Sequence, residues 1–140
     1  MSVLAEREAD AIRDVFATLE QDVPVRLETG PAATPVTLLA AGGREVDTCE
    51  ETRLLVEAVC ALSDRVRLEH VEHHEPGAWP QTTIGDGLVY RGMPVGYELT
   101  ALVHAIVEAG RCASSLSEAA RQRLATLRRP VELRVYVTPT

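Results

Sequence analysis

A cysteine at the start of an expected helix is the residue of this sequence best placed for chemistry. Cys49 stands in the run VDTCEETRLL, just before a series of apolar residues at helical spacing. A thiol beside the backbone N–H groups of a helix start is favoured as the thiolate, which is the form that attacks disulfides. With glutathione or a partner protein as the second thiol, such a cysteine catalyses monothiol exchange.

Acidic neighbours argue against that activity. Asp47, Glu50 and Glu51 flank the cysteine, and nearby negative charge disfavours a thiolate. We therefore expect an unreactive cysteine at the helix start, retained for structural reasons. A redox role for Cys49 is the alternative.

The other two cysteines do not complete a redox pair. The chain contains Cys49, Cys60 and Cys112, and no C-x-x-C pair occurs in its 140 residues. Eleven residues of helix, the spacing of the first two, rise about 16 Å, which is too far for a disulfide. An odd and sparse set of cysteines also does not describe a disulfide framework.

The segment HVEHHE gathers histidines and glutamates, which are potential metal ligands. His70 and His73 would meet on a helix or in a turn. We expect a strand here, and positions three apart on a strand point to opposite faces. No C-x-x-C pair or helical His-Glu-x-x-His accompanies them. We therefore expect no metal site, and no cofactor.

The overall composition predicts a soluble, acidic protein. Hydrophobic residues make up 46% of the chain and aromatic residues 4%, and the net charge is −7. This charge repels a phosphate backbone, so nucleic acid is not an expected partner. No apolar run reaches the length of about 18 residues that a membrane span needs. The acidic N-terminal stretch lacks the order of a signal peptide, so we expect a cytoplasmic protein.

Hydrophobic periodicity predicts one α/β domain in which helices pack on a mixed sheet. Gly110 is expected to close a helix, and Ser114 or Ser117 to cap the next one. A hairpin is indicated by QTTI, a Gly-Asp-Gly turn and LVYRG. The expected helices span 2–21, the Cys49 segment to residue 62, 96–110 and 114–129, and the other expected strands are Val23–Glu28, Val36–Ala40, 65–73 and 131–138.

Several longer runs are similar to a known family. The most specific are YRGMPVGYEL and RPVELRVYVTPT, and they are accompanied by CEETRLLVEAVCALSDRVRLE, WPQTTI and LSEAARQRLATLRR. Together they resemble one thioredoxin-fold unit of the glutaredoxin-like protein disulfide oxidoreductases. They also resemble the N-terminal domain of the flavoprotein subunit of alkyl hydroperoxide reductase. The resemblance covers roughly Cys49 to Thr140. It predicts a single thioredoxin-like domain at 1–140, with an N-terminal helix and extra strand, at about 1–34, before the family-like core.

Three departures from the family pattern bear on function. In the family a helix opens with C-x-x-C, and the resemblance places Cys49 at the second, resolving position and Val46 at the first, attacking one. The segment between RLEHVEH and WPQTTI is too short for the helix that the oxidoreductases carry there. The family continues from its VTPT strand into the cysteines of a second unit, whereas this sequence stops at Thr140. The resemblance therefore implies redox ancestry without a conventional dithiol.

The resemblance also places Trp79 and Pro80 at the family's cis-proline, which faces the cysteine pair. A tryptophan is larger than the residue expected before that proline. Its ring would either fill the place of the missing dithiol or line a shallow apolar cleft that binds a small ligand or peptide. We expect the filling role.

The last expected strand lacks an evident neighbour. In the two-unit relatives the strand that corresponds to PVELRVYV lies inside the second sheet. An unpaired apolar strand is a template for association. We therefore expect strand 131–138 to pair with its copy in a homodimer or with a protein partner, or to fold back beside Val23–Glu28 in a rearranged sheet.

The function that these observations favour is that of a thioredoxin-like domain without the active dithiol. It would serve as a non-catalytic accessory or interaction module in redox homeostasis. One alternative is a monothiol disulfide reductase that uses Cys49. The other is a binder of small ligands or peptides in the cleft at Trp79 and Pro80.

Overall fold

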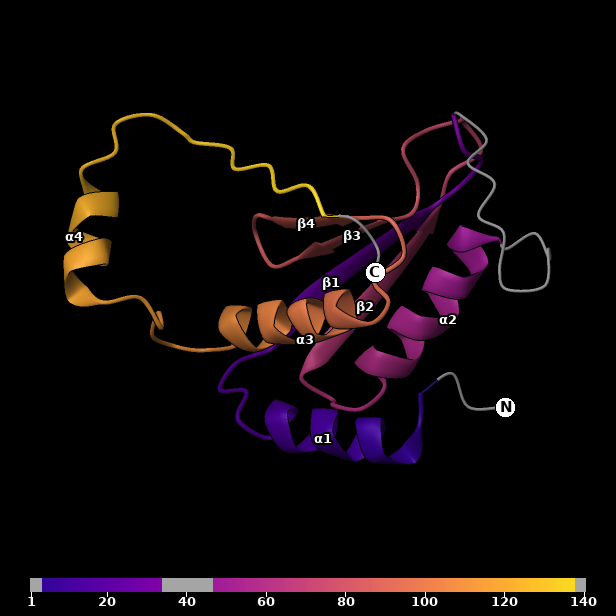
Figure 1. Ribbon diagram of the computed structural model, residues 1–140, viewed down its shortest axis with the longest axis horizontal. Coiled ribbons are helices and arrows are strands. Elements are labelled where there is room, and N and C mark those ends of the chain that lie inside the picture. The colour runs from indigo at the N-terminus through magenta and orange to yellow at the C-terminus, as the bar shows by residue number, and fades with distance from the viewer. Residues whose placement is uncertain (1–3, 34–46, 138–140) are drawn as a thin grey trace.

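The computed structural model describes residues 4–33 and 47–137. Figure 1 shows a sheet with helices packed against it and a C-terminal segment that extends away. None of the helices in these two ranges is long and apolar enough to cross a membrane. The elements, in chain order, are α1 (Glu6–Phe16), β1 (Val23–Thr29), α2 (Thr48–Cys60), β2 (Val66–Glu72), β3 (Gln81–Ile84), β4 (Leu88–Arg91), α3 (Tyr97–Ala109) and α4 (Glu118–Ala125).

The four strands form one mixed sheet in the order β2-β1-β3-β4. β1 runs parallel to β2 and antiparallel to β3, so that Leu27 lies between His70 and Thr82. β3 and β4 form the expected hairpin. The α/β fold with a mixed sheet is therefore confirmed. From the sequence we expected the segment of β1 to be an extra strand that precedes the family-like core. In the structure β1 is an inner strand of the sheet, with β2 on one side and β3 on the other.

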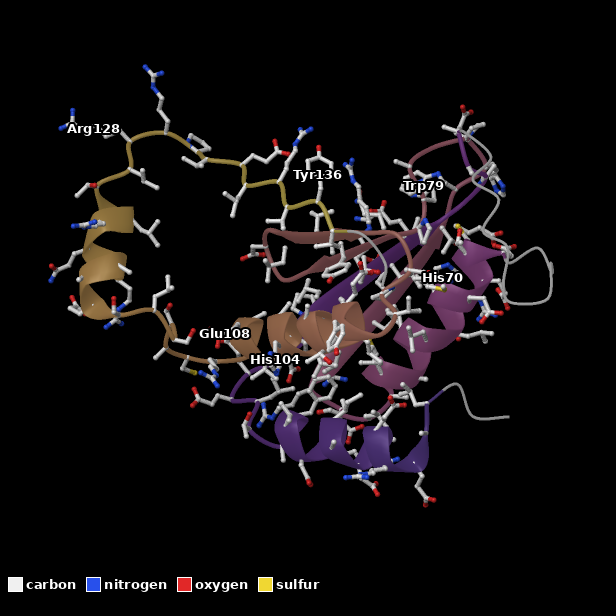
Figure 2. The ribbon with its side chains drawn as sticks, in the orientation of Figure 1. His70, Trp79, His104, Glu108, Arg128 and Tyr136 are labelled. Carbon is white, nitrogen blue, oxygen red and sulfur yellow. The ribbon has the colours of Figure 1, made fainter. Side chains whose placement is uncertain are left out.

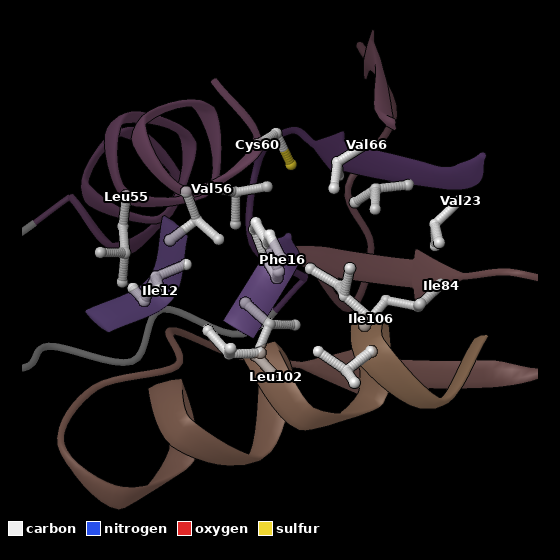
Figure 3. Close-up of a cluster of buried hydrophobic side chains, with 14 of the residues drawn as sticks. Ile12, Phe16, Val23, Leu55, Val56, Cys60, Val66, Ile84, Leu102 and Ile106 are labelled. Carbon is white, nitrogen blue, oxygen red and sulfur yellow. The ribbon is translucent and has the colours of Figure 1, made fainter. Parts of the chain in front are cut away.

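One face of this sheet carries the hydrophobic core. Val23, Val25 and Leu27 alternate along β1 with more exposed residues, and all three belong to one buried cluster with residues of α1, α2 and α3. Figure 3 shows Val23 in this cluster together with Phe16, Val56 and Ile106. Phe16 of α1 is 2% exposed and is the largest of the fully buried side chains. The alternation of β1 follows from the two-residue period of a strand with one buried face.

The opposite face of the sheet is polar. Arg26 and Glu28 of β1 point to this side, and the Gln81 amide of β3 donates to Glu28 at 3.1 Å. The Arg91 guanidinium of β4 donates in turn to Gln81 at 3.2 Å. Residues 73–80, which connect β2 to β3, contain no helix. This confirms that the connection is too short for the helix that the oxidoreductases carry there.

The helix ends agree with the expected signals. Ser117 caps α4 by accepting a hydrogen bond from the Ala120 N–H at 3.2 Å. Gly110 ends α3, and a Cβ at this position would collide with Leu19, so the close approach of the two segments requires glycine. The expected strand Val36–Ala40 lies outside the described residues.

Residues 111–137, which we call the arm, do not join this core. Helix α4 forms as expected, but none of its residues is buried among the described residues. Residues 131–137 form no strand within the described chain, so the expected strand 131–138 is wrong for the isolated molecule. An alternating sequence becomes a strand only where another strand satisfies its N–H and C=O groups, and none does so here. We call the described residues up to 110 the body.

Candidate functional site

A cleft of about 540 Å³ lies where the carboxyl ends of β1 and β2 meet the start of α2. In sheets of this kind, ligands and reactive groups gather outside the carboxyl ends of the strands, where neighbouring connections diverge. The lining residues are mostly polar: Thr29, Gly30, Pro31, Asp47, Cys49, Glu50, Arg53, His70, Glu72, His73 and His74.

Cys49 lies in this cleft, half-buried, at the second residue of α2. The residue before the helix, Asp47, caps it: its carboxylate Oδ1 accepts the N–H groups of Cys49 at 3.0 Å and of Glu50 at 3.1 Å. The thiol itself donates to the carbonyl oxygen of Gly30, with Sγ 3.4 Å from that oxygen. The sequence therefore placed the cysteine correctly at a helix start.

These contacts differ from those that activate a thiol at a helix start. A helix start stabilises a thiolate through its free N–H groups and its positive dipole end. At this helix start the carboxylate of Asp47 already accepts two of those N–H groups and adds a negative charge. The Cys49 thiol is thus engaged with a backbone carbonyl, and two of the N–H groups beside it are already taken.

Arg53 is the arginine of the cleft, and its charge is used by its own helix. It pairs with Glu50 at 2.6 Å and with Glu57 at 2.9 Å. These hydrogen bonds raise the pKa of Arg53 and lower that of Glu50. The guanidinium therefore neutralises two carboxylates of α2, which leaves it little capacity to activate a sulfur atom.

The other two thiols have raised pKa values. Burial on α2 raises the pKa of the Cys60 thiol to about 12. Cys112 is exposed at the start of the arm, and a hydrogen bond with the Glu20 carboxylate raises its pKa. In the described ranges all three cysteines are free.

The histidines of β2 and the turn after it separate as expected for a strand. His70 Nε2 lies 2.8 Å from Thr29 Oγ1, whereas His73 Nε2 lies 3.0 Å from Glu28 Oε1. Thr29 and Glu28 are neighbours on β1 and point to opposite faces. Among the described residues no group of three histidine, cysteine or acidic side chains could hold a metal ion.

The peptide bond between Trp79 and Pro80 is cis, as the resemblance predicted. The Trp79 ring stacks on His73, with 4.1 Å between ring centroids and 2° between planes. Its indole N–H donates to the carbonyl oxygen of Glu75 at 3.2 Å. Figure 2 shows Trp79 and His70 on the side of the sheet where α2 begins.

Two glycines make room for this ring. A Cβ at Gly30 would lie 2.9 Å from the Trp79 ring, and one at Gly77 would lie 2.5 Å from it. The tryptophan thus packs against Gly30 and His73, which both line the cleft. The ring does not itself line the cleft, but it contacts two residues that do.

Neither the capping role of Asp47 nor the contact of Gly30 and Gly77 with the Trp79 ring was predicted from the sequence. Asp47 carried a usable signal, because an aspartate directly before a helical stripe is a common cap. Gly30 and Gly77 carried none, because their contact with Trp79 depends on the folded chain. Val46, expected at the position of the attacking cysteine, lies outside the described residues.

Neither protein-family models nor curated proteins give a match to this sequence. Solved structures do match. A protein disulfide oxidoreductase from Aeropyrum pernix superposes with a TM-score of 0.70 at 19% identity, over 91% of this chain and 56% of that one. The N-terminal domain of the alkyl hydroperoxide reductase AhpF from Enterococcus faecalis superposes with a TM-score of 0.69 at 16% identity, over 90% and 62%.

The chain has a thioredoxin-like fold. A second structure of the Enterococcus faecalis protein gives the same result, with a TM-score of 0.68 at 16% identity, over 89% of this chain and 61% of that one. The resemblance to thioredoxin-fold units is thus confirmed at the level of the fold. The chain spans about 60% of the length of the structures it matches.

Proposed function

We propose that this thioredoxin-like domain is a non-catalytic module that binds a protein partner of thiol–disulfide metabolism. The observation that carries the proposal is the setting of Cys49. Its thiol donates to Gly30, and the N–H groups beside it are taken by Asp47. A thioredoxin-fold enzyme needs an available thiol beside free helix N–H groups at this place, and both contacts take up those groups.

The kind of partner is suggested by the solved structures, which are a protein disulfide oxidoreductase and an alkyl hydroperoxide reductase component. The absence of a C-x-x-C pair from the 140 residues supports a role beside such enzymes. Three widely separated cysteines are typical of a reducing compartment, which supports the cytoplasm as the location.

A disulfide reductase assay with glutathione tests this proposal. The wild-type chain and Cys49→Ser are compared on a small disulfide and on a glutathionylated peptide. We expect both proteins to match the background rate of glutathione alone. Cys112→Ser is a matched control, because it removes an exposed thiol far from the cleft. Turnover that Cys49→Ser abolishes and Cys112→Ser retains would establish a monothiol reductase instead.

The cleft supports a second candidate function, the binding of a small ligand or peptide. Its volume of about 540 Å³ is that of a ligand site. Trp79 packs on its wall, so a bound ligand would change the tryptophan fluorescence. Titration with short cysteine-containing peptides and with glutathione tests this function. Saturable quenching that His73→Ala weakens would support it, and a flat titration would remove it.

A further inference from the structure

The arm exposes a large amount of apolar surface. Leu133 is 85% exposed, Val135 75% and Tyr136 86%. Figure 1 shows the arm leaving the end of α3, passing through α4 and running back toward β4. Single exposed apolar residues are common, but a run of them on one extended segment marks a surface that another molecule covers.

This segment has the pattern of a strand with two different faces. Its apolar residues alternate with Glu132, Arg134 and Tyr136. The Arg134 guanidinium donates to Glu132 at 2.6 Å, as expected for side chains two residues apart on one face. The other face carries Val131, Leu133, Val135 and Val137.

We propose that residues 131–135 of the exposed segment 131–137 pair antiparallel with the same residues of a second copy of this chain. Leu133 lies on the two-fold axis of the resulting dimer, opposite the partner's Leu133. In this register Glu132 lies opposite the partner's Arg134, and Val131 lies opposite the partner's Val135. The pairing satisfies the backbone groups of residues 131–135 that face the partner and covers part of each apolar face.

The charges select this register over its neighbours. Directly opposed residues of antiparallel strands share a face, so a shift of one residue would put apolar side chains opposite charged ones. A shift of two residues would place either Arg134 opposite the partner's Arg134 or Glu132 opposite the partner's Glu132. Like charges directly opposite one another destabilise a sheet, and unlike charges stabilise it. Only the register centred on Leu133 places apolar residues opposite apolar residues on one face and opposite charges opposite each other on the other face.

The sheet of the same chain is a poorer partner for the arm. The arm passes near β4, since Arg91 of β4 contributes, after Arg134, to the lowered pKa of Glu132. β4 offers four residues, Leu88–Arg91, to a segment of seven, and no strand pairing joins them in the described chain. β2 forms the opposite edge of the sheet. A second arm offers a strand of equal length.

The helix of the arm provides a cover for the paired strands. A two-stranded ribbon alone is only marginally stable in water and needs an apolar layer against it. Leu124 of α4 and Leu127 just after it are each about half exposed and lie on one side of a helical turn. We assign these leucines of both copies to the apolar face of the ribbon.

Charge reversal tests the pairing and its register together. Sedimentation equilibrium across a roughly hundredfold range of concentration should give a monomer–dimer equilibrium for the wild-type chain. Arg134→Glu places acidic residues opposite one another at two sites per dimer and should weaken dimerisation about tenfold. The double variant Glu132→Arg with Arg134→Glu restores opposite charges and should return to the wild-type affinity. Arg128→Glu makes the same change of charge outside the paired segment and should have little effect.

Disulfide trapping tests the axis directly. In a Cys112→Ser background, Leu133→Cys should form a dimer cross-link when oxidised glutathione is added, because opposed Cα atoms lie about 5 Å apart. Glu132→Cys should cross-link far less, since its copies are diagonal to one another. A strict monomer, or a dimer that Arg134→Glu does not weaken, would overturn the proposal. Equal cross-linking at positions 132 and 133 would overturn the register.

Discussion

The body and the arm of this molecule have similar local sequence signals and opposite outcomes. Both contain a capped helix with ion pairs and an alternating segment. In the body, α2 and β1 bury their apolar faces against each other and against Phe16. In the arm, α4 and residues 131–137 bury nothing among the described residues. Local signals form a helix in both places, but only the body has the non-local partners that make a strand and a core.

The largest expected effect is on the free energy of unfolding, which should depend strongly on the body and weakly on the arm. Phe16→Ala should lower the free energy of unfolding by about 3–5 kcal/mol, because it removes the largest fully buried side chain. Leu124→Ala, at a side chain 52% exposed on the arm, should change it by less than about 0.5 kcal/mol. Urea unfolding monitored by circular dichroism, at a concentration where the chain is monomeric, measures both. A comparable loss for Leu124→Ala would mean that the arm belongs to the cooperative core.

The next effect sharpens the comparison within the body. Gly77→Ala should destabilise the fold by about 1–3 kcal/mol, because the added Cβ would lie 2.5 Å from the Trp79 ring. Gly87→Ala is the matched control, since a Cβ there meets nothing within 4 Å. Thermal unfolding and the Trp79 emission spectrum report both variants. Equal stability of the two variants would contradict the tight seat of the ring.

A buried thiol of the body and an exposed thiol of the arm should differ in their effect on pH dependence. The pKa of Cys60 is raised in the folded chain from an ordinary value of 9.0 to about 12. The unfolded chain therefore loses this proton first, and stability should fall between about pH 9 and 12, by up to about 1.4 kcal/mol per pH unit. Cys60→Ala should flatten this decline more than Cys112→Ala does, because Cys112 and its partner Glu20 are exposed and solvent screens their interaction; urea unfolding at several pH values can measure both. An unchanged slope in Cys60→Ala would contradict the burial of the thiol.

The smallest effect concerns the cap of α2. Asp47→Asn keeps an acceptor for the N–H groups of the helix but removes the negative charge beside Cys49. The change should speed alkylation of Cys49 about two- to fivefold, a typical effect of one charge at a helix end. Mass spectrometry of iodoacetamide-treated protein gives the rate at each cysteine. Cys112 serves as the internal reference, and a rate of Cys49 that stays constant relative to it would count against the role of Asp47.

The sequence predicted those parts of the fold that depend on neighbouring residues. Apolar spacing located α2 and α3, and the Gly-Asp-Gly turn located the β3–β4 hairpin. The cis peptide bond at Pro80 followed from the resemblance to a family, since an X-Pro sequence by itself does not reveal it.

The remaining features depend on contacts between distant residues. The inner position of β1 arises from pairing with β2 and β3, and its alternating pattern suits an edge strand as well. The bond from Cys49 to Gly30 joins residues 19 positions apart. In the arm, a strand was predicted that the isolated chain does not form. Residues 131–137 have the alternating pattern of a strand, but no other strand of the described chain pairs with them. A pattern of side chains specifies a face, and a second strand must supply the hydrogen bonds.

The central claim is that Cys49 is an unreactive thiol, half-buried and engaged with the Gly30 carbonyl oxygen. Site-resolved alkylation by iodoacetamide at neutral pH, in the folded wild-type chain and in urea, tests it most directly. We expect Cys49 to react at least about tenfold more slowly in the folded chain, because its thiol is engaged with the Gly30 oxygen and the sulfur is half-buried. A faster reaction in the folded chain than in urea would show an activated thiolate and contradict this account.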